Sequence, residues 1–415
     1  MTCPKVRLAA ISMVALLAGY VVPVHAQDWT QWRGPNRDGV VKDFAAPATW
    51  PKGLANKWKV AVGGGYSSPV VSGSKIYLHT REGENEVVSC FDLKTGKTLW
   101  SKSYAAPFSK NQYAIEMGKG PNSTPTIYAG NIYTLGVNAV LSCFDAETGE
   151  LKWRKDFSAK IDTSKLFCGT AMSPVIDKGL VIIHVGDDRM GTLVAFDAMT
   201  GKQKWEWQGD GPGYSSPIVV ELEGVRQIVT LTDKTFVGIS AVDGKLLWSV
   251  PFPDEWNENI VTPVHYRKML IVSGVRKGTI AFEPVKGKTG WSVRQVWQNP
   301  KVAMYLSSPV LDGNYLYGMS SLRKGQYFCI NAETGELLWA TDGRSGRNAS
   351  VLGAGNVLMF LTEDAELIVA NKSPKGFESI ARYTVGDAAT WAHLVVFGKN
   401  ILVKDEAALT LWSIE

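Results

Sequence analysis

The stretch Asp-Leu-Lys-Thr-Gly-Lys-Thr-Leu-Trp, residues 92–100, decides the fold because its pattern returns along the chain. Asp-x-x-Thr-Gly-x-x-x-Trp is complete again at Asp145–Trp153 and Asp197–Trp205. Asn331–Trp339 has asparagine in place of the aspartate, and Ser240–Trp248 has Asp-Gly in place of Thr-Gly. In every copy the tryptophan follows the glycine by four residues. A unit that recurs about every 50 residues predicts a stacked or radial repeat architecture.

Each repeat opens with Ser-Pro or Thr-Pro before an alternating apolar run, as in Ser68-Pro69-Val70-Val71. Proline at the first residue of a strand removes no ladder hydrogen bond, so it marks a strand start. A second strand such as Lys75–His79 and a third such as Val87–Phe91 follow, and the Thr-Gly turn leads into a fourth, Thr98–Ser101. Short alternating strands between turn residues predict an all-β fold of four-stranded antiparallel blades.

Counting these openings predicts an eight-bladed β-propeller. The blades are expected to begin near Ser67, Ser123, Ser173, Ser215, Thr262, Ser307, Ser350 and Ala392. The last unit has only three strands, and the N-terminal strand Asn56–Val60 is expected to supply its fourth. This pairing closes the ring and removes an exposed sheet edge. Seven blades is the alternative, if the unit near Ser350 merges with a neighbour.

The residues of the repeated phrase are predicted to be structural. Glycine adopts the positive φ of a tight turn, and aspartate accepts hydrogen bonds from turn amides. Tryptophan buries a large flat surface, and its indole N–H needs a partner. We therefore expect these side chains to dock each blade on the next: Trp100, Trp153, Trp205, Trp248 and Trp339.

Residues 1–26 have the features of a cleaved secretory signal peptide. Lys5 and Arg7 precede an apolar run, Leu8–Val22, and Val24-His25-Ala26 fits a cleavage site. A lipoprotein signal needs cysteine at the cut, whereas Leu16-Leu17-Ala18-Gly19 is followed by tyrosine. The sequence therefore predicts a periplasmic or secreted protein without a lipid anchor.

The remaining chain divides into a leader segment, residues 27–55, and a propeller domain, residues 56–415. The formal net charge of +5 falls when Lys5 and Arg7 are removed, so the mature chain is nearly neutral. Such a charge argues against a nucleic-acid partner. No other segment approaches 18 consecutive apolar residues, so we expect no transmembrane segment. We also expect the protein to be a monomer.

These repeats resemble the tryptophan-docking repeats of the pyrroloquinoline-quinone (PQQ) type of β-propeller, from about Trp58 to Glu415. That family has a branch of quinoprotein alcohol and glucose dehydrogenases and a non-enzymatic branch typified by BamB, a subunit of the outer-membrane β-barrel assembly machinery. The segment Trp29–Gly39 is similar to the leader of many secreted bacterial PQQ-repeat proteins of unassigned function. Resemblance to the non-enzymatic branch implies an assembly scaffold.

The enzyme branch implies PQQ held against a disulfide of adjacent cysteines, together with calcium. This chain has no Cys-Cys pair. Calcium takes six to eight oxygen ligands. The available candidates have no spacing that requires a metal: Asn122, Asp187, Asp188, Glu258, Asn259 and Asn348. We therefore predict no cofactor, no metal site and no catalytic residue. A PQQ- and calcium-dependent alcohol or sugar dehydrogenase is the alternative.

The candidate binding residues lie in loops that ring the central channel. In a propeller, the loops between blades and the loops joining second and third strands share one face. The candidates in these loops are Asn122, Arg189, Arg276, Arg323, Arg347 and Trp391. Arginines and aromatics suit an anionic ligand, a carbohydrate or a peptide segment. We predict a non-catalytic scaffold for a protein partner in the cell envelope. The alternative is a propeller that binds a small ligand or carbohydrate in this funnel.

Overall fold

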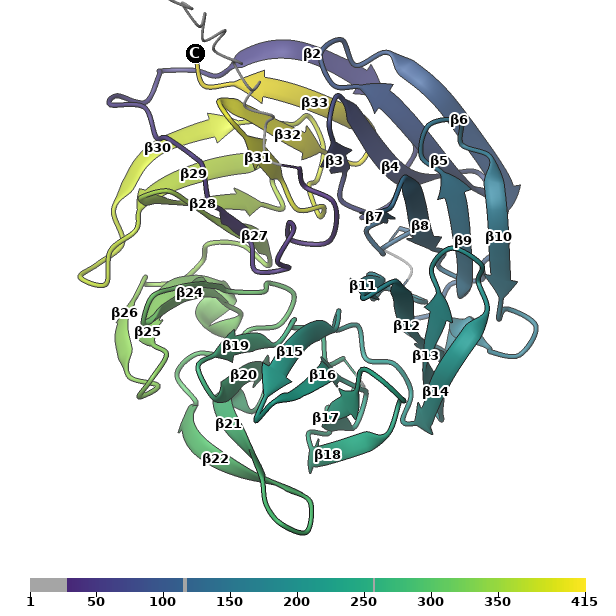
Figure 1. Cartoon of the computed structure of the whole chain (residues 1–415). Helices are drawn as coiled ribbons and strands as arrows, with labels where there is room; N and C mark the ends of the chain where they lie inside the picture. Colours follow the sequence, from purple (N-terminus) through teal and green to yellow (C-terminus); the bar gives the residue numbers. More distant parts are fainter. Residues whose placement is uncertain (1–27, 115–117, 257) are drawn as a thin grey trace, which may run out of the picture.

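The computed structural model describes residues 28–114, 118–256 and 258–415 (Figure 1). The predicted signal peptide, residues 1–26, lies outside the described residues. Within them, the strands form eight separate sheets arranged in a ring, each with four strands from one blade. The prediction of an all-β, eight-bladed propeller is confirmed, and the seven-blade alternative is wrong because residues 349–384 form a sheet of their own.

Blades one to four follow the chain in order. Their strands are β3 (Val70–Ser72), β4 (Lys75–Glu82), β5 (Asn85–Asp92) and β6 (Thr98–Ala105); β7 (Thr126–Tyr128), β8 (Asn131–Leu135), β9 (Val140–Asp145) and β10 (Leu151–Asp156); β11 (Val175–Asp177), β12 (Leu180–Gly186), β13 (Gly191–Asp197) and β14 (Gln203–Gly209); and β15 (Ile218–Leu222), β16 (Val225–Leu231), β17 (Thr235–Ser240) and β18 (Leu246–Pro251).

Blades five to eight complete the ring. Their strands are β19 (Val264–Tyr266), β20 (Met269–Gly274), β21 (Gly278–Lys286) and β22 (Trp291–Asn299); β23 (Val310–Asp312), β24 (Tyr315–Ser320), β25 (Gln326–Asn331) and β26 (Leu337–Ala340); β27 (Ala349–Ala354), β28 (Val357–Thr362), β29 (Glu366–Asn371) and β30 (Ser379–Thr384); and β31 (Val395–Phe397), β32 (Asn400–Lys404) and β33 (Ala408–Ser413). Two 3-10 turns, η1 (Thr163–Lys165) and η2 (Leu322–Lys324), lie in the connections.

The N-terminal strand closes the ring as predicted. Strand β2 (Ala55–Ala61) pairs antiparallel with β33 and supplies the fourth strand of blade eight. A bulge lies between Asn56 and Trp58, and the register beyond it joins Trp58 to Leu411. Blade eight is thus built from an N-terminal and a C-terminal part of the chain, and β2 forms its outer edge.

The Ser/Thr-Pro openings hold neighbouring blades together near the axis. The innermost strands start one residue after the proline, at Val70 and Ile218 for example, and not at the proline itself. The residue before the proline uses its side-chain oxygen to accept a backbone N–H from the preceding blade. The distance from the backbone nitrogen to the accepting side-chain oxygen is 3.1 Å from Ser68 to Thr124, 3.0 Å from Thr124 to Ser173 and 2.9 Å from Ser173 to Ser216. These bonds form an inner belt of the ring.

Tryptophans form a matching outer belt. The Trp100 indole donates to the carbonyl of Ala146 in the next blade at 3.2 Å, and its ring lies over Gly149. A Cβ on that glycine, whose φ is +71°, would lie 2.6 Å from the ring. The same pairing of an indole with a carbonyl and a glycine of the next blade recurs for Trp58 with Leu93 and Gly96, Trp153 with Ala198 and Gly201, Trp205 with Ala241 and Gly244, and Trp297 with Ala332 and Gly335.

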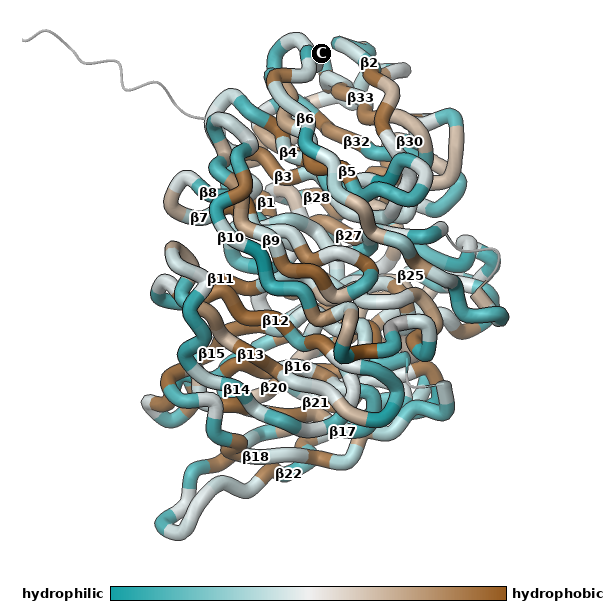
Figure 2. Tube along the Cα trace, turned by 90° about the vertical axis from the view of Figure 1, so that its right-hand side faces the viewer, coloured by the Kyte–Doolittle hydropathy of each residue, from teal (hydrophilic) through white to brown (hydrophobic). Residues whose placement is uncertain are grey.

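Two of the expected docking tryptophans depart from this pattern. Trp248 donates at 2.7 Å to the Gln227 side chain of its own blade. The following blade joins its outer strands by a longer hairpin with its turn at residues 287–290, so it presents no Thr-Gly turn to Trp248. Trp339 donates to the Ser373 carbonyl of blade seven at 2.9 Å. The long β21–β22 hairpin projects from the body of the protein (Figure 2).

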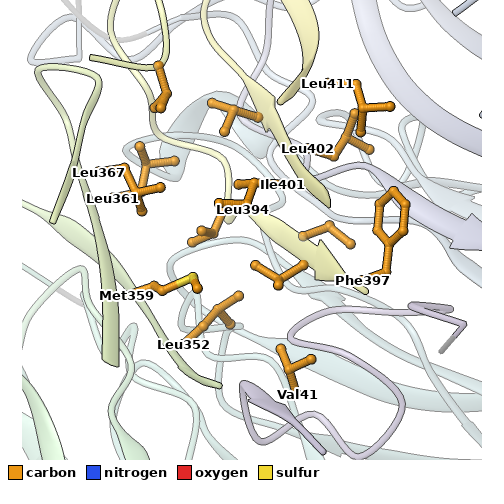
Figure 3. Close-up of a cluster of buried hydrophobic side chains, with 14 of the residues drawn as sticks. Val41, Leu352, Met359, Leu361, Leu367, Leu394, Phe397, Ile401, Leu402 and Leu411 are labelled. Carbon is orange, nitrogen blue, oxygen red and sulfur yellow. The ribbon is translucent and has the colours of Figure 1, made fainter. Parts of the chain in front are cut away.

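The core lies between successive blades. Figure 2 shows hydrophobic stretches along inner strands such as β12 and polar residues in the connecting loops. The largest buried cluster joins the leader and blades one, seven and eight. In Figure 3, Val41 from the leader lies near Leu352 of β27, with Phe397 and Ile401 of blade eight in the same cluster. The leader is therefore part of the core at the point where the ring closes.

Candidate functional site

The leader segment lies inside the ring, against the inner strands. Trp29 pairs with Val71 of blade one, and the Thr30 carbonyl accepts the Ile127 N–H of blade two at 2.8 Å. Strand β1 (Val40–Val41) then pairs parallel with β27 as a fifth strand of blade seven. Figure 1 shows this purple segment between β3 and β27. The leader thus joins blades one and two to blade seven, which lies far from them in sequence.

Two buried arginines fasten the leader to further blades. Arg37 donates to the carbonyls of Ser173 and Pro174, at 3.1 and 3.0 Å. Arg33 donates to the carbonyl of Pro309 in blade six. Burial lowers the pKa of Arg33 to about 10 and that of Arg37 to about 9, so both remain charged at neutral pH. Charge-assisted bonds to carbonyls satisfy part of each buried group, while both Nε atoms have no hydrogen-bond partner within the described residues.

A cavity of about 960 Å³ lies next to the leader and is lined by Trp32 of that segment. Trp32 lines its inner end, where the indole donates to the Thr262 hydroxyl at 3.1 Å and the ring meets His393 edge-on at 4.4 Å. The walls come from loops that precede the innermost strands, with further residues from the β24–β25 loop. Because adjacent strands are antiparallel, both kinds of loop lie at the same end of a blade. We call this end the funnel face.

Three of the six candidate binding residues line the cavity, namely Asn122, Arg347 and Trp391. The Arg347 guanidinium bonds to Glu363, with Nε 3.0 Å from Oε1, and lies 5.6 Å from the centre of the Trp391 ring. Asn122 donates through Nδ2 to the Cys168 carbonyl at 2.9 Å. These contacts join loops that the sequence separates widely.

The other three candidates are not among the lining residues. Arg189 bonds to Asp187, with Nη2 2.7 Å from Oδ2. Arg276 forms an ion pair with Glu255 and lies over the ring of Trp256, 5.2 Å from its centre. Their charges are therefore partly neutralised on the face outside the cavity. Arg323 lies in η2 with a φ of +52°, and its neighbour Lys324 lines the cavity in its place.

An aromatic wall is the feature that the sequence reasoning missed. Tyr66, Tyr214 and Tyr305 line the cavity together with Phe167 and Trp32. A signal for the tyrosines exists, because each stands one or two residues before a Ser-Ser-Pro opening. The Tyr66 hydroxyl accepts the Gly118 N–H at 2.9 Å, and that of Tyr214 accepts the Phe167 N–H at 2.8 Å. These bonds hold the rings at the wall.

The charged groups of the cavity are divided between its two sides. Lys324, Arg344 and Arg347 come from loops of blade six and the connection into blade seven. Glu258 comes from the connection between blades four and five, where it accepts a hydrogen bond from the Tyr305 hydroxyl. Burial raises the pKa of Glu258. The cavity is therefore cationic on one side and carries a single carboxyl group on the other.

The residues of the cavity do not fit calcium-bound PQQ. Glu258 is the one carboxylate among the lining residues, and Asn259 donates its amide to the carbonyls of Thr232 and Phe252. Asp187 is paired with Arg189. Over residues 28–114, 118–256 and 258–415, no three His, Cys, Asp or Glu side chains gather as a metal site. Calcium needs six to eight oxygen ligands, which this arrangement does not supply.

Comparison with known proteins places this fold in a family. Residues 84–322 and 276–374 match the family described as outer membrane protein assembly factor BamB. The chain belongs to this BamB family. Within the part of the chain that the structure describes, no helix has the length and apolar character needed to cross a membrane.

Relatives of two kinds, BamB proteins and an alcohol dehydrogenase, are similar to this chain in sequence. BamB of Kangiella koreensis is 30% identical over 30% of this chain and 28% of its own length. BamB of Burkholderia pseudomallei is 25% identical over 74% of this chain and 85% of its own length. The 1-butanol dehydrogenase (cytochrome c) of Thauera butanivorans is 25% identical over 55% of this chain. The chain spans only 28% and 34% of the lengths of the Kangiella and Thauera relatives.

Solved structures of both kinds share the fold. BamB from Moraxella catarrhalis superposes with a TM-score of 0.62 at 16% identity, covering 87% of this chain and 97% of that one. The quinohemoprotein alcohol dehydrogenase ADHIIG from Pseudomonas putida gives a TM-score of 0.65 at 14% identity, covering 94% and 80%. At these identities the likeness concerns the fold alone, so function has to be argued from the site.

Proposed function

We propose that this protein is a non-catalytic binding scaffold of the periplasm or the extracellular space, where it acts as a monomer and docks a protein partner on its funnel face. Membership of the BamB family supports this proposal, because the family's described role is the assembly of outer membrane proteins. A cavity with one carboxylate and no adjacent cysteines offers no platform for the calcium-assisted quinone chemistry of the dehydrogenase relatives.

The single observation that carries the proposal is the set of exposed apolar side chains around the funnel. Tyr113, Met190 and Trp256 are 78%, 62% and 56% exposed, in loops that belong to the funnel face. Aromatic residues, methionine and arginine are enriched at the centres of protein interfaces. Arg189 is next to Met190 in the β12–β13 loop, and the Arg276 guanidinium lies over the Trp256 ring from the β20–β21 loop. This combination favours oriented docking of a protein surface.

Site-specific photo-crosslinking in intact cells tests the proposal. A photoreactive residue in place of Met190 or Trp256 should give a discrete crosslinked product in the envelope or secreted fraction. The same residue in place of Val242 is the control, because Val242 is 81% exposed but lies in the turn between β17 and β18, at the opposite end of its blade. Crosslinking from Val242 alone, or from none of the three positions, would contradict docking on the funnel face.

A further inference from the structure

We propose that the cavity behind the funnel face is a binding site for an acidic saccharide, a short oligosaccharide bearing carboxylates. This site goes beyond the docking of a protein partner and does not depend on it. A volume of about 960 Å³ is at the upper end of the range for small-molecule pockets, which leaves room for two or three sugar rings. The inference rests on three features of the lining: flat aromatic faces, hydroxyl and amide groups, and cations on one side.

Flat aromatic faces suit the apolar faces of sugar rings. Trp391 and Tyr66 lie side by side at the wall, with ring centres 5.6 Å apart, and Trp32 lines the inner end. Tyr214 and Tyr305 line the cavity separately from this pair, in the connections that precede blades four and six. Rings that combine an apolar body with a polar tip stack on a ligand and hydrogen-bond to it at the same time.

Polar groups at the inner end match a ligand rich in hydroxyls. Ser173, Ser216 and Ser308 each accept a backbone N–H through Oγ, at 2.9–3.1 Å, so each hydroxyl hydrogen is left to donate to a ligand. Asn122 and Asn348 each have an amide oxygen that receives no hydrogen bond within the described residues. An amide oxygen without a donor favours a ligand hydroxyl that reaches it.

Cations at one side select for negative charge. Lys324 and Arg344 line the cavity and form no ion pair within the described residues. Their backbones adopt left-handed conformations, with φ of +62° and +63°, and the Arg344 N–H donates to the Arg323 carbonyl at 3.0 Å. Arginine and lysine here are placed to receive a sugar carboxylate.

The closed inner end of the cavity favours a compact ligand over a peptide that would have to pass through the ring. Trp32 and the leader occupy the channel below the cavity, so an extended chain has no exit on that side. A compact ligand with carboxylates near the mouth and hydroxyls toward the serines uses every feature of the lining. The carboxyl group of Glu258, on the side away from the cations, adds a further hydrogen-bonding group for sugar hydroxyls.

Isothermal titration calorimetry on the full mature protein tests this assignment. The probes are trigalacturonate, trimannuronate and a glucuronate-containing tetrasaccharide, with neutral galactotriose for comparison. At least one acidic probe should bind ten or more times more tightly than galactotriose, and its affinity should fall as the salt concentration rises. The variants Arg344→Gln and Trp391→Ala should each weaken that binding tenfold or more.

The matched control is Arg276→Gln, which removes an arginine of the same face outside the cavity and should leave the affinity unchanged. Thermal unfolding checks that Arg344→Gln is folded. Glutamine and arginine have the same difficulty with the left-handed backbone at this position, so the substitution adds no backbone strain. The assignment is overturned if no acidic probe binds more tightly than galactotriose, or if Arg344→Gln and Arg276→Gln have equal effects. Tighter binding of a peptide with a free carboxyl terminus than of every acidic saccharide would overturn it as well.

Discussion

The rim of the ring and the leader segment at its axis are held by different kinds of contact. At the rim, one contact is repeated: an indole lies on a turn glycine of the next blade, as Trp100 does on Gly149. At the axis, the leader segment is bonded through residues that occur once, such as Trp29 and Arg37. The repeated rim contact stabilises in the same way the five junctions where it occurs, those of Trp58, Trp100, Trp153, Trp205 and Trp297. The single-copy contacts at the axis shape one cavity, where we propose that a ligand binds.

The largest expected effect tests whether the leader belongs to the core. Trp29→Ala should lower the free energy of unfolding by about 3–5 kcal/mol, as for other buried tryptophans. Trp29 is 1% exposed and packs with Val71 and Phe397 in the cluster that closes the ring. Urea denaturation measures the change. Trp256→Ala is the control, because Trp256 is 56% exposed and its loss should cost under about 0.5 kcal/mol. If Trp29→Ala lowered the free energy of unfolding as little as Trp256→Ala does, Trp29 would not be part of the stabilising core.

The rim contact is tested by adding one methyl group beneath a tryptophan. Gly149→Ala should destabilise the protein by about 3 kcal/mol, since left-handed backbone costs alanine about 1 kcal/mol and the overpacked Cβ adds about 2. Gly130→Ala has the same backbone requirement, with a φ of +73°, but nothing within 4 Å of its Cβ. It should cost about 1 kcal/mol. Chemical denaturation of both variants gives the difference, and similar values would exclude the packing contact with Trp100.

A buried carboxyl group on the funnel face should make stability depend on pH. Asp233 follows β16 and is 1% exposed; its carboxylate oxygens receive no hydrogen bond within the described residues, and Lys234 Nζ lies 3.6 Å from Oδ2. Burial raises the pKa of Asp233 to about 6, above its ordinary value of 3.8. The folded state therefore binds the proton more tightly, and Asp233 reduces stability as pH rises from about 4 to 6. Above pH 6 the reduction is complete.

Asp233→Asn removes this ionisation and should stabilise the protein by about 2–3 kcal/mol at pH 7.5, with little gain at pH 4. Urea denaturation of the two proteins at both pH values isolates the effect, because His184, with a pKa lowered to about 4 by burial, is present in each. A gain that is the same at pH 4 and pH 7.5 would contradict the assignment. The result would measure how much a buried charge in a funnel-face loop destabilises the protein, apart from the tryptophan contacts that stabilise the rim.

The smallest effect is the coupling across one rim junction. A double-mutant cycle of Trp100→Leu with Gly149→Ala should show an interaction energy of about 1 kcal/mol, because the two residues are in contact. Trp248→Leu with Gly149→Ala should be additive within about 0.5 kcal/mol, since Trp248 bonds to Gln227 of its own blade. Coupling of equal size in both cycles would mean that the rim acts as one continuous unit.

The sequence by itself determined the ring. The turn chemistry of Asp92, Thr95 and Gly96 is local, and it recurs at a fixed spacing, so blade number and the closing strand β2 followed from counting. The sequence also located the funnel loops, and Asn122, Arg347 and Trp391 do line the cavity. A repeat is readable because each copy encodes the same short-range contacts.

Only the tertiary structure decided what fills the axis and which loop residues meet there. Arg37 bonds to residues 136 and 137 positions away, and Trp32 to Thr262, 230 positions away. A short repeat in the sequence does not indicate contacts between residues so far apart along the chain. Trp248 shows the same limit at the rim, because its partner was set by the long hairpin of the following blade. Side chains from nine loops converge on the cavity only because the ring brings the start of every blade to one axis, a property of closure that no single segment contains.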